Sequence, residues 1–226
     1  MSLKKAIGII VLVLLIDQIS KIYIKTNFAL GEKIVVFDWF QILFVENRGM
    51  AWGVELPGSY GKLLLTLFRL FAITAIGYWL YDSIKKHSSR VLIIAVSLIF
   101  AGALGNIIDS VFYGVIFNGS EGQIATFLPD EGGYAPVFYG RVVDMFHFPM
   151  IDTTWPEWTP WVGGDRFTFF DPVFNVADSA ITVGVALLII FNKKAFPKKK
   201  KEDKKSDDGN SEGGKATAQE EYTGII

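Results

Sequence analysis

The sequence predicts an integral membrane protein: an all-α bundle of four transmembrane helices with a small extracytoplasmic β-rich segment and enlarged outer loops. Three observations predict this class. The 226-residue chain is 51% hydrophobic and 15% aromatic, more apolar than an ordinary soluble domain. Four apolar segments are long enough for the roughly 20 helical residues that cross a bilayer core. Basic residues gather at one end of these segments.

The predicted spans cover residues 5–25, 63–84, 91–113 and 173–192. The first follows Lys4 and Lys5 and so begins like a signal peptide, but no small-x-small cleavage site follows it. The apolar run instead continues past Asp17 as SKIYIK. We therefore expect an uncleaved first spanning helix.

The distribution of charge predicts the orientation. Basic residues precede the first span, separate the second from the third, and follow the fourth, whereas segment 114–172 holds two arginines against eight acidic residues. Because short cytoplasmic loops carry the excess of Lys and Arg, we expect both termini in the cytoplasm and segments 26–60 and 114–172 outside. The predicted protein is thus multi-pass.

The remaining segments complete the predicted organisation. Residues 33–57 are rich in Val, Phe, Trp and Ile but too punctuated to span, so we expect short strands on the membrane surface with a turn at Asn47–Gly49. Residues 1–196 would form the membrane domain, with a long outer loop at 114–172. Residues 197–226 are charged and Gly- and Ser-rich, which predicts a disordered cytoplasmic tail.

Composition excludes several kinds of site. The chain has no cysteine, which removes disulfides, thiolate metal sites and cysteine nucleophiles. Its two histidines, His87 and His147, form no HExxH motif, and no G-x-S-x-G elbow occurs. We expect no metal, no cofactor and no nucleic-acid partner.

Four carboxylates are expected at one depth. The first and third spans run outward, which places Asp17 and Asp109 near their outer ends, and the fourth runs inward, which places Asp178 in its outer turns. Asp144 lies in the outer segment that leads back to the membrane, while Asp82 lies at the opposite face. Ionisable residues in membrane segments are costly and usually functional. The alternative to a functional role is that these four carboxylates make polar contacts that hold the helices together.

The spacing of these residues suggests a chemistry. Asn-x-x-Asp occurs at 106–109 and again at 175–178, so each amide shares a helix face with its carboxylate, and Asp17 and Lys21 have the i, i+4 spacing of an ion pair. Two carboxylates held close together share one proton, so one can activate water while the other polarises a carbonyl. That is aspartic peptidase chemistry. The residues alone leave open whether Asp109 or Asp144 faces Asp178.

Five motifs in order resemble the lipoprotein signal peptidase (signal peptidase II) family: DQISK (17–21), ENRGMAWG (46–53), GALGNIID (102–109), GRVVDMF (140–146) and FNVADSAI (174–181). The resemblance implies an aspartic endopeptidase of the bacterial cytoplasmic (inner) membrane. Such an enzyme removes the signal peptide of prolipoproteins just before the diacylglyceryl-modified cysteine. The resemblance also implies contact with membrane lipids, an active site near the outer face, and inhibition by globomycin-type inhibitors.

The resemblance implies that Asp144 and Asp178 form the catalytic dyad. The other matching positions, which would shape the site or hold substrate, are Asp17, Lys21, Asn47, Gly49, Ala51, Asn106, Asp109, Asn175 and Ala177. Ser110 stands where the family usually has Arg, and Ala101 where it usually has Gly. The outer stretches 114–140 and 147–172 are longer than the family's usual loops.

Three other classes of protein compete with this interpretation. A presenilin-like protease would use Asp82 and Asp165, but Val162 replaces a required Gly and the two carboxylates would lie on opposite sides of the membrane. A transporter would need a polar path through the inner halves of the helices, which the sequence lacks. A membrane scaffold with structural acids is the third, and cleavage of a lipidated precursor would separate it from a peptidase.

The motif WPEWTPW, residues 155–161, repeats Trp at every third position. A polyproline II stretch has three residues per turn and would place the three indoles on one side. Two environments suit such a row. It could lie on the outer leaflet and help lipidated substrate enter sideways, or form a small core within the outer segment.

Overall fold

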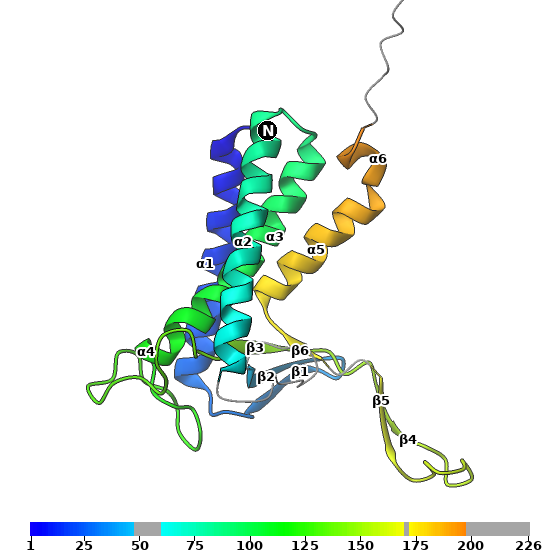
Figure 1. Ribbon diagram of the computed structural model, residues 1–226. Coiled ribbons are helices and arrows are strands. Elements are labelled where there is room, and N and C mark those ends of the chain that lie inside the picture. Colours follow the sequence, from blue (N-terminus) through cyan, green and yellow to red (C-terminus); the bar gives the residue numbers. More distant parts are fainter. Residues whose placement is uncertain (48–59, 170–171, 198–226) are drawn as a thin grey trace, which may run out of the picture.

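The computed structural model describes residues 1–47, 60–169 and 172–197. Three long helices, α1, α2 and α3, stand together, and a small sheet lies across one end of them (Figure 1). The helices are α1 (Leu3–Asn27), α2 (Gly61–Lys85), α3 (Arg90–Ile108), the π-helical turn η2 (Asp109–Tyr113), α4 (Gly114–Ile116), α5 (Val176–Ile190) and α6 (Asn192–Ala195).

The long helices match three of the predicted spans. α1 and α2 each have 25 residues, and α3 with its continuation to Ile116 has 27, so all three are long and apolar enough to cross a membrane. α5 is apolar but has 15 residues, because it begins only at Val176 rather than at 173 and ends at Ile190. Crossing by α5 therefore stays a prediction.

Close backbone contact joins α3 to α5. A Cβ atom on Gly102 would lie 2.2 Å from the carbonyl oxygen of Ala177, and one on Gly184 would lie 2.7 Å from that of Ala95. Real Cβ atoms do not come so close, so glycine at both positions allows the two backbones to touch. This contact places the first turn of α5 against the C-terminal half of α3.

Gly102→Ala should force α3 and α5 apart. Overpacking of this kind costs about 1–3 kcal/mol of stability, and the displaced element carries Asp178, so activity should fall as well. Thermal unfolding in detergent measures the first effect. Gly8→Ala is the control, because nothing lies within 4 Å of a Cβ there. Equal stability of Gly102→Ala and the wild type would contradict the packing argument.

The small sheet contains four antiparallel strands in the order β1-β2-β3-β6. They are β1 (Lys33–Phe37), β2 (Phe40–Asn47), β3 (Val142–His147) and β6 (Val173–Phe174). The sequence predicts short strands within residues 33–57. The structure has two strands in residues 33–47, and the turn between them lies at residues 38–39. β2 ends at Asn47, and the rest of the expected turn at Asn47–Gly49 lies in residues 48–59, outside the described residues.

The pairing of β2 with β3 joins segments far apart in the chain. Val45 lies opposite Asp144 and Asn47 opposite Val142. Apolar side chains fill the space between this sheet and the helix ends, namely Ile24, Phe28, Phe44, Tyr113, Phe117, Val143 and Met145. β3 is thereby held against the end of the bundle formed by the C-terminal part of α1 and by η2.

A second hairpin carries the tryptophan motif. Strands β4 (Ile151–Thr154) and β5 (Arg166–Phe169) pair with each other and project away from the bundle (Figure 1). The polyproline II prediction is wrong, because the tip forms successive turns and Trp161 has φ of 66°. Trp155 packs on Phe167, with ring centroids 4.9 Å apart. Trp158 and Trp161 are 81% and 99% exposed, so they form no core.

Candidate active site

A fully buried ion cluster joins α1 to the end of α3. Lys21 Nζ lies 3.0 Å from Asp17 Oδ2 and 2.8 Å from Asp109 Oδ2, and all three side chains are 0% exposed. The backbone N–H of Ala177 donates to Asp17 Oδ1 at 2.9 Å. The expected Asp17–Lys21 pair is therefore present, and it also holds the start of α5.

Gln18 completes this cluster, although sequence reasoning passed over it. Its Nε2 donates to Asp17 Oδ2 and to Asp109 Oδ1, each at 3.0 Å, and its Oε1 accepts from the Tyr113 hydroxyl at 3.2 Å. The sequence does contain a signal for Gln18, because it is a polar residue next to Asp17 in an otherwise apolar helix. Both oxygens of Asp109 are thus committed to Lys21 and Gln18.

Asp144 lies apart from that cluster and is held by two amides. It is buried at 2% exposure on β3. Asn175 Nδ2 donates to its Oδ1 at 2.7 Å, and Asn47 Nδ2 donates to its Oδ2 at 2.8 Å. The Asp178 carboxylate, in the first turn of α5, accepts from Asn106 Nδ2 at 2.8 Å. Amides thus fix the orientation of both carboxylates.

The two Asn-x-x-Asp motifs play different roles. Asn175 is the N-cap of α5, and with Asp178 it forms a capping box, in which its Oδ1 accepts from the Asp178 N–H at 3.0 Å. Asn106 lies inside α3 but donates to Asp178 rather than to Asp109. Although each amide shares a helix face with the carboxylate of its own motif, neither side-chain amide donates to that carboxylate: Asn106 donates to Asp178, and Asn175 donates to Asp144. Packing of α5 against α3 decides the partner.

The environment of Asp144 favours its protonated form. Burial, and then the charge of Asp178, raise the pKa of Asp144 to about 7. The hydrogen bonds from Asn47 and Asn175 and the charge of Lys21 oppose this rise without cancelling it. Near neutral pH, Asp144 can therefore hold a proton, as one member of a carboxylate pair must.

Asn47→Ala should move the alkaline limb of the pH–rate curve to higher pH. The Asn47 hydrogen bond favours the ionised form of Asp144, so its loss raises the pKa of that carboxyl further and the group keeps its proton to higher pH. Asn27→Ala is a matched control, because that exposed amide bonds Tyr23 at the end of α1. A downward shift in Asn47→Ala would contradict the assignment of this hydrogen bond.

The second helix adds two cations that sequence reasoning did not place in the site. Lys62 Nζ donates to Ser110 Oγ at 3.4 Å, so a lysine from α2 reaches the position where the resembled family usually has Arg. Arg69 lies close enough to Asp178 and Asp144 for their charges to act on its guanidinium. α2 is one unbroken helix past both residues.

The remaining predicted positions are distributed as follows. Gly49 and Ala51 lie outside the described residues. Ala177 is buried and bonds Asp17 through its backbone. Asp82 forms an exposed pair with Lys86 at 2.7 Å near the end of α2. In the described ranges, no three His, Asp or Glu side chains are grouped so as to hold a metal ion.

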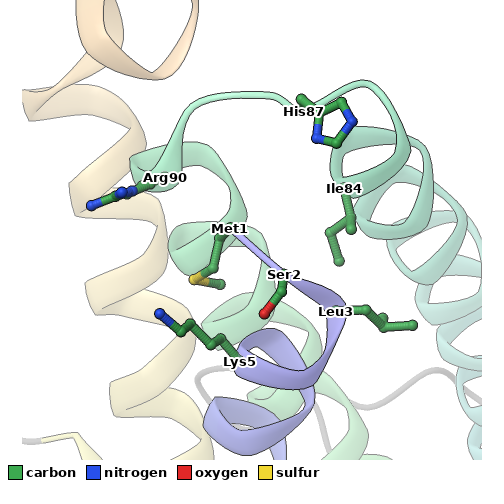
Figure 2. Close-up of a pocket in the computed structure, with 7 residues that line it drawn as sticks. All are labelled: Met1, Ser2, Leu3, Lys5, Ile84, His87 and Arg90. Carbon is green, nitrogen blue, oxygen red and sulfur yellow. The ribbon is translucent and has the colours of Figure 1, made fainter.

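A pocket of about 700 Å³ lies at the N-terminal end of α1, the end of the bundle away from the sheet. Its lining residues are Met1, Ser2, Leu3, Lys5, Ile84, His87 and Arg90 (Figure 2). Lys5 and Arg90 lie on one side of it and His87 on the other. Because it contains no carboxylate and its cations do not converge, it is not the candidate active site.

An apolar helix bundle with buried carboxylates gathered at one end defines an integral membrane protein with an acidic site. The chain belongs to the signal peptidase II family, whose model, described as Signal peptidase (SPase) II, matches residues 9–193. Membership of this family makes the chain a protease.

Individual relatives agree with this assignment. A lipoprotein signal peptidase of Porphyromonas gingivalis is 52% identical over 188 residues, which cover 83% of this chain and 82% of that protein. One from Amoebophilus asiaticus is 36% identical over 190 residues, covering 82% and 76%. A solved structure described as a bacterial membrane enzyme is similar with a TM-score of 0.58 at 27% identity, covering 88% of this chain and 94% of that one.

Proposed function

We propose that the chain is an aspartic endopeptidase that removes the signal peptide of prolipoproteins on the N-terminal side of the diacylglyceryl-cysteine. The observation that carries this proposal is the arrangement of Asp144 and Asp178. Each accepts a hydrogen bond from a neighbouring amide, and the charge of one acts on the other. Asp109 is committed to Lys21 and Gln18, so it is not available as the partner of Asp178.

The two carboxylates would divide the proton transfers. Asp178, ionised, takes a proton from water while the water oxygen adds to the scissile carbonyl carbon. Asp144, protonated, gives its proton to the carbonyl oxygen, which yields a tetrahedral diol. The diol then collapses: one of its hydroxyl groups returns its proton to Asp144 as the carbonyl re-forms, the C–N bond breaks, and the proton on Asp178 passes to the leaving amine. Neither metal nor cofactor enters these steps.

The proposed site lies near the outer face of the bacterial inner membrane. Supporting this, β3, which carries Asp144, and the first turn of α5, which carries Asp178, lie at the end of the bundle away from the N-terminus and α6 (Figure 1). The basic residues Lys4, Lys5, Lys85, Lys86 and Arg90 at that other end support a cytoplasmic position for it, because short cytoplasmic loops carry the excess of Lys and Arg. α5 then makes the fourth crossing. Entry of lipidated substrate past the exposed Trp158 and Trp161 stays a prediction.

The purified protein should cleave a diacylglyceryl-modified precursor and leave the same precursor without the lipid intact. Mass spectrometry of the product should place the new N-terminus at the modified cysteine. Activity should persist in a chelator, because the proposed steps use no metal, and should fall with a globomycin-type inhibitor. Cleavage at another bond, or equal cleavage of both precursors, would overturn the proposal.

A further inference from the structure

A second set of buried charges lies on β2 beside the residue that bonds Asp144. Lys25 of α1 and Glu46 of β2 form an ion pair with side chains 0% and 2% exposed. Lys25 Nζ also donates to Ser120 Oγ at 2.9 Å, and Ser120 donates to the same Glu46 oxygen at 3.0 Å. A buried pair gains little net stability after desolvation, so its geometry is the more informative feature.

The other oxygen of Glu46 is bonded as well. Arg141 Nη1 donates to Glu46 Oε2 at 3.2 Å and also pairs with Glu121. The hydroxyl of Tyr134 accepts from the backbone N–H of Arg141 at 2.6 Å, and its ring faces Lys25 Nζ at 5.0 Å. Glu46 is thus held from one side by α1 and from the other by the outer segment 117–141.

This network lies on the face of the sheet opposite to the dyad. Successive side chains of a strand point to opposite faces. Asn47, the last residue of β2, points to Asp144, so its neighbour Glu46 points to Lys25 and Arg141. Glu46 lies opposite Val143 and Asn47 opposite Val142 in the register of β2 with β3. A shift of Glu46 along or away from β3 would carry Asn47 with it.

We propose that Glu46 is a positioning residue for Asp144: its bonds to Lys25 and Arg141 hold the end of β2 so that Asn47 keeps its hydrogen bond to that carboxylate. This inference rests on the proposed function. It also assigns a role to the enlarged outer segment. Ser120, Tyr134 and Arg141 fasten that segment to Glu46 and thereby support the active site from the reverse face of the sheet.

The sign of a pH shift separates positioning from a simple charge effect. Asp144 is faced by the charges of Asp178 from α5, Lys21 from α1 and Arg69 from α2. Removing the negative charge of Glu46 would, by Coulomb's law alone, ease ionisation of Asp144 and move the alkaline limb to lower pH. Loss of the Asn47 hydrogen bond moves the same limb to higher pH. The two mechanisms therefore predict opposite shifts.

The test is the pH–rate curve of Glu46→Gln with the lipidated precursor. A glutamine offers one oxygen where the carboxylate offers two, so its amide nitrogen must face the donors of Lys25 or Arg141 and the end of β2 is released. The alkaline limb should move up by about one pH unit, as expected for losing a hydrogen bond to a charged group. Glu46→Gln/Asn47→Ala should shift no further than Asn47→Ala, because both remove the same bond. An unmoved limb, a downward shift, or additive shifts would overturn the inference.

Two further variants complete the experiment: the first is a control for loss of stability, and the second replaces Glu46→Gln if that variant does not fold. Ile93→Ala removes a fully buried side chain near the other end of α3, so it should lower stability and leave the limb in place. If Glu46→Gln does not fold, Lys25→Met/Glu46→Gln replaces it, because removing both buried charges avoids leaving either alone. Failure of the wild type to cleave the precursor would overturn the proposed function itself. Normal cleavage with an unshifted limb in the Glu46 variants would overturn only this inference.

Discussion

Asp144→Asn and Asp178→Asn should each abolish cleavage of a lipidated precursor while the protein still inserts and folds. Asparagine is nearly isosteric with aspartate but cannot exchange the proton, so either the water loses its base or the carbonyl loses its acid. General acid–base assistance alone contributes about 10²–10⁴-fold, and each substitution should cost at least that much. Single-turnover cleavage by protein reconstituted in lipid measures the loss.

Asp82→Asn is the matched control for the dyad variants. Its carboxylate forms an exposed pair with Lys86 at the other end of α2, so its activity should stay close to that of the wild type. Asp109→Asn separates the two possible partners of Asp178. Asp109→Asn should lower the stability of the protein, because Asp109 bonds Lys21 and Gln18. The rate of cleavage by the fraction that still folds should fall less. Near-normal activity in either dyad variant would exclude that residue from the chemistry.

Lys21→Met should cause the largest loss of stability. The substitution leaves the carboxylates of Asp17 and Asp109 buried together without the cation between them. Removing one partner from a buried ion pair typically costs about 3–5 kcal/mol. Thermal or denaturant unfolding in detergent, followed by circular dichroism, measures the change.

Lys86→Met is the control for Lys21→Met. It removes the same functional group from an exposed i, i+4 pair with Asp82 and should change the unfolding midpoint little. If both variants unfolded alike, the ion cluster at Lys21 would not hold the helices together. Because Asp17 also accepts the Ala177 N–H, Lys21→Met should in addition loosen the first turn of α5.

The structure separates two of the supporting residues. The family resemblance groups Asn175 with Asp17 among the positions that would shape the site or hold substrate. Asn175 donates directly to Asp144 and caps the helix that begins with Asp178. Asn175→Ala should therefore shift the alkaline limb upward, as Asn47→Ala does, while Asp17→Ala should act on stability.

Features that depend on residues close in the chain could be read from the sequence. Helix length and polarity identified three spans, and the i, i+4 spacing of Asp17 and Lys21 predicted their ion pair. Placing the outer ends of the predicted helices at one depth indicated that Asp17, Asp109 and Asp178 belong to one region. Each of these follows from the 3.6-residue repeat and the 1.5 Å rise of a helix.

Spacing alone left open whether Asp109 or Asp144 faces Asp178, and the tertiary structure shows what holds each of these carboxylates. Asp109 is bonded by Lys21 and Gln18, whereas Asp144 is brought beside Asp178 by the pairing of β3 with β2 and by the glycine contact between α3 and α5. The network around Glu46 likewise joins α1, β2 and the outer segment. Local spacing contains no information on strand register or on which helix faces meet. These depend on the packing of the whole chain, because each buried polar group must find its partner among residues distant in sequence.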